Sequence, residues 1–193
     1  MNKQYYLPPV FCFLVLIVCP SILYGQETMI LGINSDEPTV ALPPRSSSNR
    51  IVAAANVDQL YYLKKGATNF KNTQAISTLG VYGDPVLHYS DRDLFYAHLS
   101  KTPNKKYGDW FDRIVVQKIH SFTPWRESSY SVGYNPPKMQ DKPWLCSDNH
   151  SKKFNGNVYV TWTEFDKYNS KDSSDFSRIR FSKYVPKFDS FSN

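Results

Sequence analysis

One pattern of segments occurs three times along this chain, and it restricts the folds that the chain can form. Each copy begins with an acidic residue, a proline and apolar residues: EPTVAL at 37–42, DPVLHY at 84–89 and DKPWLC at 141–146. After a polar turn comes a second run: RIVAAAN at 50–56, LFYAHLS at 94–100 and VYVTWTEF at 158–165. A third run completes each copy: QLYYLKK at 59–65, DRIVVQK at 112–118 and SRIRFSK at 177–183. Short apolar runs separated by turns predict antiparallel strands in three repeated units.

The spacing of the copies indicates what each unit is. Their first residues, Glu37, Asp84 and Asp141, follow one another at intervals of about 50 residues, which is the length of a four-stranded β-propeller blade. Fourth strands are expected at 73–78 and 128–134, whereas the third copy reaches Asn193 before such a strand is complete. We therefore predict an all-β fold with about three four-stranded blades of an incomplete β-propeller ring. A β-sandwich of similar length is the alternative.

The composition agrees with an all-β fold. The chain holds 14 Tyr, 12 Phe and 4 Trp, residue types that suit a pleated, half-buried surface. Its 13 Pro, with many Asn, Ser and Asp, interrupt the sequence every few residues, and no long segment has helical periodicity.

The first 25 residues have the order of a secretory signal peptide. Lys3 precedes a largely apolar run at 10–18, and small and polar residues lead to Gly25. The apolar run is well short of the roughly 20 residues that a membrane span needs. We expect residues 1–25 to be cleaved, 26–36 to form an N-terminal segment and 37–193 to form the partial propeller. The protein is then secreted, or lies at the cell surface or in the periplasm.

Cleavage would remove two of the three cysteines and leave Cys146 alone. No intramolecular disulfide could then form, so packing or a bound ion must stabilise the exported domain. Cys146 falls in a predicted first strand, where we expect it to behave as a small buried hydrophobic residue.

The formal net charge is +6, but the basic residues are scattered in pairs along the chain. This distribution favours solvated loops over a nucleic-acid surface. Weak attraction to anionic glycans stays open.

The third runs lead into segments that look like degenerate copies of the sialidase Asp-box, S-x-D-x-G-x-T-W. Gly66 and Phe70 in LYYLKKGATNF take its glycine and tryptophan positions, Trp125 in VVQKIHSFTPW lies one place out of register, and Phe191 in RFSKYVPKFDSF takes the tryptophan position. Together with GDPVLHYS, KMQDKPWL and VYVTWTEFDKY, residues 35–193 resemble the secreted bacterial sialidase-like propellers with BNR repeats. Catalytic members of that family have six blades. The resemblance thus implies an N-terminal fragment, or a chain that needs further blades or another chain to close its ring.

The resemblance also implies a chemistry: three arginines that grip the substrate carboxylate, an aspartic acid–base, and a tyrosine nucleophile with a glutamate partner. No catalytic residue is assignable from the motifs. The family's early aromatic-Arg-Ile-Pro motif is absent, because Arg50 lies in NRIVAA without the proline. Two functions stay open, a sialidase-like glycoside hydrolase of which this chain alone is inactive, and a non-catalytic module that binds a glycan or a protein.

In a propeller, the loops before first strands and after second strands open on one face, while the Asp-box turns lie on the opposite face and are structural. The candidate ligand-face residues are therefore Asp84, His98, Asp141, Glu164, Asp166, Arg113 and Arg178.

Each candidate has a structural alternative. Asp84 and Asp141 suit turns whose carboxylates accept backbone N–H bonds, and Glu164 and Asp166 suit solvated loops. Arg113 follows Asp112 and Arg178 comes shortly after Asp175, which favours local ion pairs. Trp144 and Trp162 are expected to pack between blades, with sugar stacking as the alternative.

The sequence predicts no cofactor and no metal site, because the four histidines show no ligand spacing with each other or with Cys146. The acidic loop at 169–175 leaves a structural calcium ion open. The expected ligand is a sialylated or other glycan, with no nucleic acid and no membrane span.

Overall fold

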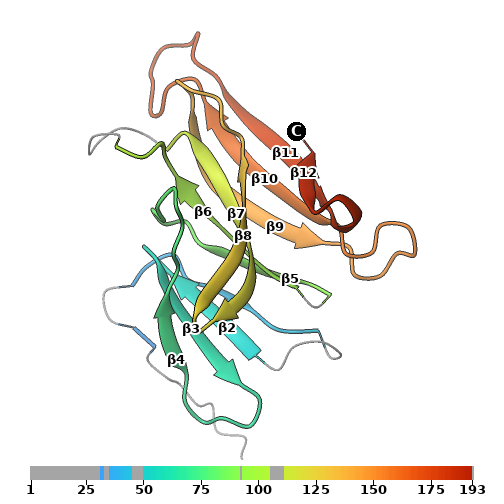
Figure 1. The fold of residues 1–193 in the computed structure, drawn as a ribbon. Helices are drawn as coiled ribbons and strands as arrows, with labels where there is room; N and C mark the ends of the chain where they lie inside the picture. Colours follow the sequence, from blue (N-terminus) through green and yellow to red (C-terminus); the bar gives the residue numbers. More distant parts are fainter. Residues whose placement is uncertain (1–30, 33–34, 45–49, 92, 105–110, 193) are drawn as a thin grey trace, which may run out of the picture. The chain divides into compact units, whose positions relative to one another are not determined.

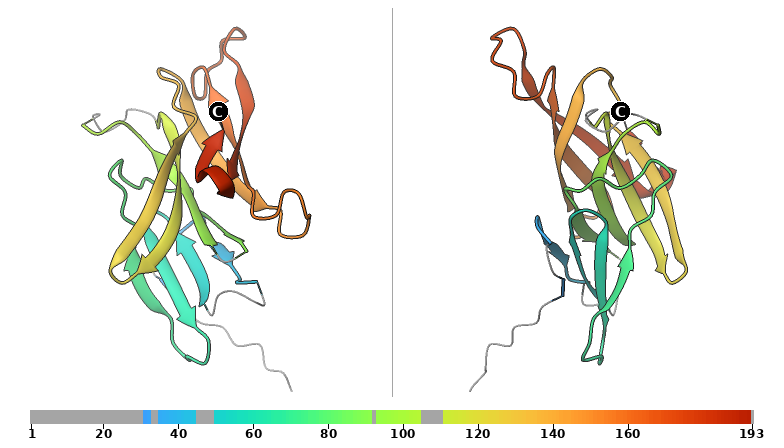
Figure 2. Two further views of the ribbon diagram at one scale, coloured as in Figure 1. Left: turned by 45° about the vertical axis from the view of Figure 1, so that its right-hand side comes forward. Right: turned by 90° about the vertical axis from the view of Figure 1, so that its left-hand side faces the viewer.

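The computed structural model describes residues 31–32, 35–44, 50–91, 93–104 and 111–192. Residues Leu31–Asn193 form one compact unit. In the described part, the chain forms three four-stranded antiparallel sheets, each made of strands that follow one another in sequence (Figures 1 and 2). The predicted signal peptide and part of the predicted N-terminal segment, residues 26–30 and 33–34, lie outside the described residues.

Sheet 1 corresponds to the first sequence repeat. Its strands are β1 (Thr39–Ala41), β2 (Arg50–Ala55), β3 (Gln59–Lys64) and β4 (Lys71–Gln74), in that order across the sheet. Alternate residues of β2 and β3 point to the same buried face, so that Val52 pairs with Tyr62 and Ala54 with Leu60. The prediction of β4 at 73–78 was wrong by several residues, since the strand ends at Gln74.

Sheet 2 is the central sheet, built from β5 (Val86–Ser90), β6 (Asp93–Ser100), β7 (Arg113–Phe122) and β8 (Trp125–Val132). Seven of the eight residues of β6 are buried, as expected for a strand covered on both faces. Strand β8 starts three residues before the predicted 128–134, because Trp125 pairs with Phe122 directly across the turn.

Sheet 3 corresponds to the third repeat and contains β9 (Met139–Ser147), β10 (Val158–Phe165), β11 (Ser177–Val185) and β12 (Ser190–Ser192). The 3-10 helix η1 (Pro186–Phe188) connects the last two strands. The fourth strand, β12, is short but present, so the expectation that the third copy stops before completing a fourth strand was wrong.

Two hydrophobic cores lie on the two faces of sheet 2. The core on the sheet 1 side includes Leu60, Tyr62, Tyr96 and Phe122, with the rings of Tyr62 and Phe122 stacked at 4.8 Å. The other core, on the sheet 3 side, has these as its largest members: Phe95, Ile114, Trp162 and Tyr184. Burying a large apolar side chain contributes about 1.5–3 kcal/mol, so these cores stabilise the order sheet 1, sheet 2, sheet 3.

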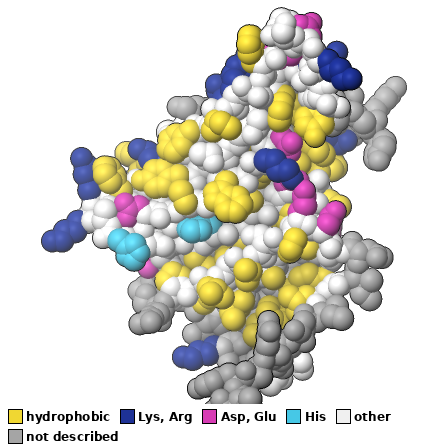
Figure 3. Space-filling model, turned by 180° about the vertical axis from the view of Figure 1, so that it is seen from behind, with side chains coloured by type: hydrophobic (Ala, Val, Ile, Leu, Met, Phe, Trp, Pro, Cys, Tyr) yellow, Lys and Arg dark blue, Asp and Glu magenta, His cyan; other side chains and the backbone are white. Residues whose placement is uncertain are grey.

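The outer face of sheet 3 carries large exposed apolar side chains, since Ile179 and Phe181 on β11 are 77% and 61% exposed. Val40 and Leu42 are 62% and 66% exposed and line a cavity beside β5. Figure 3 shows apolar side chains in several patches over the face seen from behind. An uncovered apolar face on an end sheet is what a partial repeat predicts.

Candidate functional site

The first strands of the three sheets lie together, and each has a proline at its start or within it: Pro38 precedes β1, Pro85 precedes β5 and Pro143 lies inside β9. Strand β5 neighbours both β1 and β9. The residue before each proline has a left-handed backbone: φ is 46° at Glu37, 50° at Asp84 and 49° at Lys142. Such a φ is uncommon outside glycine. Its recurrence therefore identifies these three residues as equivalent positions of the repeat.

This equivalence corrects the sequence alignment. We expected an acid at the start of every copy, with Asp141 in the third. The backbone instead places Lys142 where the first two copies have Glu37 and Asp84. Asp141 lies one residue earlier, where its Oδ1 accepts a hydrogen bond from the N–H of Lys142 at 2.9 Å, as its turn alternative predicts.

We call each of the left-handed residues Glu37, Asp84 and Lys142, with the proline that follows it, a corner. The three corners line an open cavity of about 250 Å³, which we call the corner pocket. Its lining consists of three residues from each sheet: Glu37, Pro38, Thr39, Asp84, Pro85, Val86, Lys142, Pro143 and Trp144. Lys142 Nζ lies 2.7 Å from Glu37 Oε1 and 3.0 Å from Asp84 Oδ2. One ammonium group thus joins carboxylates from two other sheets.

Asn56, at the end of β2, holds two of these corners together. Its Nδ2 donates to Glu37 Oε2 at 2.9 Å, and its Oδ1 accepts the Asp84 N–H at 2.8 Å. The position beside Asn56 requires a glycine, Gly83. Its φ is 104°, and a Cβ there would come within 2.7 Å of Asn56 Oδ1. Sequence analysis missed Asn56, although its place after a second strand puts it on the predicted ligand face.

The two carboxyl groups of the corner pocket have very different proton affinities. Burial raises the pKa of Asp84 to about 7, and its hydrogen bond with Glu37 acts in the same direction. The pKa of Glu37 falls to about 2, because Asp84 and Lys142 both donate to it. Partial burial opposes ionisation of Lys142, but the two carboxylates raise its pKa overall. The pocket therefore holds a proton donor and a proton acceptor side by side.

Trp144 forms the rim of the corner pocket and is 69% exposed, so the expectation that it packs between sheets was wrong. It lies on the outer face of β9, as does Cys146, which is exposed rather than buried. Leu145 between them takes the buried face. Trp162 does pack as expected: it is 4% exposed, and its Nε1 donates to Gln140 Oε1 at 2.6 Å.

Two other candidates of the ligand face are buried and lie outside the corner pocket. His98 is fully buried on the sheet 1 side of sheet 2, where its Nδ1 donates to the Leu99 carbonyl at 2.9 Å. Glu164 is 1% exposed and accepts hydrogen bonds from Asn135 and Gln140. Neither the surface role of His98 nor the solvated-loop alternative for Glu164 fits this burial.

The remaining candidates form local ion pairs. Arg113 Nε donates to Asp112 Oδ1 at 2.7 Å, as expected. Arg178 binds both carboxylate oxygens of Asp166, at 2.7 and 2.8 Å, and not Asp175 as expected. Lys138 contacts the same Asp166 carboxylate at 2.8 Å, so this side chain is also not free to bind a ligand.

The Asp-box-like residues lie in the turn after the third strand of a sheet or in its fourth strand. Gly66 has φ of 79° in the turn after β3, and Phe70 precedes β4. Trp125 begins β8 and donates from Nε1 to the Ile76 carbonyl at 3.1 Å. Phe191 in β12 packs on Tyr130 and Tyr184.

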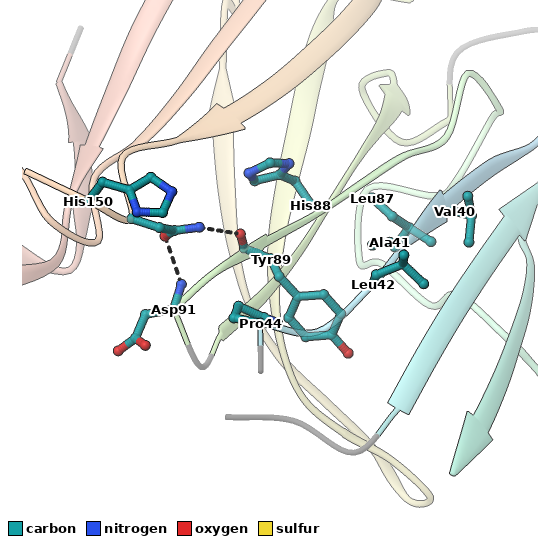
Figure 4. Close-up of a pocket in the computed structure, with 10 residues that line it drawn as sticks. Val40, Ala41, Leu42, Pro44, Leu87, His88, Tyr89, Asp91 and His150 are labelled. Atoms are coloured by element: carbon teal, nitrogen blue, oxygen red, sulfur yellow. Dashed lines mark hydrogen bonds between the residues drawn. The ribbon is translucent and has the colours of Figure 1, made fainter. Parts of the chain in front are cut away.

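A second cavity, of about 600 Å³, lies beside β1, β5 and the β9–β10 loop. Figure 4 shows its lining, with Val40, Ala41 and Leu42 at one end and His150 at the other. Asn149 braces it, accepting from the Asp91 N–H at 2.9 Å and donating to the Tyr89 carbonyl at 3.3 Å. Burial lowers the pKa of His88, whose Nε2 contacts Ser147 Oγ at 2.8 Å. This cavity lacks the charged cluster of the corner pocket.

Within the described residues, no three His, Cys, Asp or Glu side chains gather as a metal site. The same residues include no helix long and apolar enough to cross a membrane. Comparisons with protein-family models, with curated proteins and with solved structures find no match.

Proposed function

We propose that this protein is an exported, sialidase-like β-propeller module that binds a glycan at the corner pocket. Three equivalent corners from three sheets bring two carboxylates, an ammonium group and an exposed indole to one cavity, and this observation carries the proposal. Pockets for drug-sized ligands measure about 300–1,000 Å³, so a cavity of about 250 Å³ suits a single sugar ring.

The chemistry of the lining supports a sugar as the ligand. Carboxylates accept hydrogen bonds from hydroxyl groups, and the protonated Asp84 can donate one. An exposed Trp144 ring offers a flat apolar surface for the C–H face of a pyranose. The residues that flank each corner are prolines, whose fixed φ keeps the loops stiff without ligand.

Three consecutive four-stranded meanders with adjacent first strands support the propeller arrangement. The exposed apolar face of sheet 3 at Ile179 and Phe181 supports a further blade, or another chain, packed against it.

Binding is tested with the full-length exported protein on an array of glycans, followed by titration of the glycans that it retains. We expect Trp144→Ala to weaken glycan binding at least about tenfold, because it removes the flat aromatic surface on which the sugar ring would stack. Phe188→Ala is the matched control, because Phe188 is 68% exposed and lies outside the pocket. Retention of no glycan, or equal binding by Trp144→Ala and wild type, would refute the proposal.

Glycoside hydrolysis is a second candidate function, favoured by the unlike pKa values of Glu37 and Asp84. The two carboxyl groups are hydrogen-bonded to each other and contact one nitrogen, so they lie closer than the 5–5.5 Å of retaining glycosidases and would have to separate to act on a glycosidic bond. Asp84 would serve as the acid and Glu37 as the nucleophile. Turnover of aryl glycosides that is lost in Asp84→Asn would support this candidate, and binding without turnover would reject it.

A further inference from the structure

The charges of the corner pocket restrict which sugars it can accept. Two carboxylates, Glu37 and Asp84, face a single ammonium group, that of Lys142. Asp141 adds a further negative charge that acts on Asp84. Lys142 contacts both carboxylates, so its positive charge is compensated before any ligand arrives.

Positive groups that could bind an anionic sugar are engaged elsewhere. A carboxylate ligand is best held by arginine, whose planar fork donates two parallel hydrogen bonds. In the described part of the chain, no arginine lines the corner pocket. Arg113 and Arg178, the two arginines expected near this face, bind Asp112 and Asp166.

A ligand carboxylate in this pocket would therefore approach the ionised Glu37, together with Asp84 wherever Asp84 has lost its proton, while the ammonium group of Lys142 is already paired with both side chains. Like-charge contacts of this kind are strongly unfavourable in binding sites. An uncharged sugar meets no such penalty, because its hydroxyl groups can donate to Glu37 and accept from a protonated Asp84 while its ring stacks on Trp144.

We propose that the corner pocket selects an uncharged pyranose and discriminates against sugars that carry a carboxylate, including sialic acid. The inference rests on the proposed glycan binding and specifies its ligand class. The protein would then resemble sialidases in its fold but would not bind the sialic acid that this resemblance implies.

The test compares two neutral sugars with their matched uronic acids, and adds a sialoside as the sugar that the resemblance implies. Methyl glucoside and methyl galactoside are titrated into the full-length exported protein by NMR at millimolar concentrations, next to methyl glucuronide, methyl galacturonide and methyl sialoside. We expect at least one neutral glycoside to bind, and its carboxylate counterpart to bind about tenfold more weakly or worse.

Charge variants identify the cause of the selectivity. Glu37→Gln should narrow the difference between glucoside and glucuronide, because it removes a negative charge while its amide oxygen and the rest of the lining stay. Glu127→Gln is the matched control, since Glu127 lies in β8 and outside the pocket lining. Thermal unfolding of both variants verifies that they fold.

The outcomes are distinguishable. Equal or tighter binding of the acidic sugars overturns the charge selectivity but leaves glycan binding intact. Selectivity that is unchanged in Glu37→Gln overturns the role assigned to the corner pocket. Binding of none of the probes, neutral or acidic, overturns the proposed function and this inference with it.

Discussion

The buried His98 should make the stability of the protein depend on pH. Desolvation lowers the pKa of His98 to about 4, although the hydrogen bond with the Leu99 carbonyl acts in the opposite direction. In the unfolded chain its pKa returns to about 6.5. Between these two values the unfolded state binds more protons than the folded state, so the free energy of unfolding increases with pH. The gap corresponds to about 3 kcal/mol, fully present above pH 6.5 and lost as pH falls through 4.

Asp84 opposes this trend in the same pH window. Its folded pKa of about 7 lies above its ordinary value of 3.8, so the folded state binds more protons there and stability falls as pH rises. The pH dependence of the wild-type free energy of unfolding therefore cannot by itself show how much His98 contributes. The perturbation is His98→Gln, which cannot titrate but keeps an N–H donor for the Leu99 carbonyl.

Urea unfolding of wild type and His98→Gln, followed by tryptophan fluorescence between pH 4 and 8, isolates the histidine. The Asp84 contribution cancels in the difference between the two proteins. We expect the stability of wild type relative to the variant to rise by about 3 kcal/mol from pH 4 to pH 7.5. A difference that stays constant within about 0.5 kcal/mol, the size of an ordinary surface effect, would show that His98 titrates normally and is not desolvated.

Further substitutions test the packing and the site. Trp162→Ala should lower the free energy of unfolding by about 3–5 kcal/mol, whereas Trp144→Ala, at an exposed position, should change it by less than about 1 kcal/mol; equal effects in urea unfolding would contradict the assignment. Gly133→Ala should cost about 1–3 kcal/mol, since φ is 70° and a Cβ would meet the Trp162 ring at 2.7 Å, and a variant with the wild-type midpoint would exclude this contact. Wild type should lose stability relative to Asp84→Asn between about pH 4 and 7, measured as the difference between their unfolding midpoints over a pH series, and a constant difference would show that Asp84 titrates normally. Replacing Ile179 and Phe181 by Ser should reduce aggregation in light scattering without loss of stability, and unchanged aggregation would show that another surface is responsible.

Most of the strand order is readable from the sequence. The second and third strands of each repeat were predicted within a few residues, and β10 was placed at its observed bounds of Val158–Phe165. These strands combine β-branched and aromatic residues with clear turns, so local preference and hydrophobic pattern agree. The fourth strands were placed less well, because their polar sequences, such as KNTQ in β4, carry little apolar periodicity.

The candidate site could be predicted only in part. Asp84 was recognised as a corner residue from its place before a proline. Lys142 was not, because the acid next to it matched the repeat better by residue type. Only the recurrence of a left-handed φ before each proline shows that Lys142 is equivalent to Glu37 and Asp84. Residue types alone do not predict such a backbone conformation.

The sequence by itself determined the repeat, the all-β class and the two alternating faces of each strand, because strand periodicity is a local property. Which face is covered was decided by the tertiary structure: Trp144 and Trp162 have similar sequence surroundings, yet one is exposed and the other is buried against the neighbouring sheet. The corner pocket was decided in the same way. Glu37 and Lys142 are 105 residues apart in sequence and in contact at 2.7 Å, and only the packing of three sheets around their first strands brings such distant charges together.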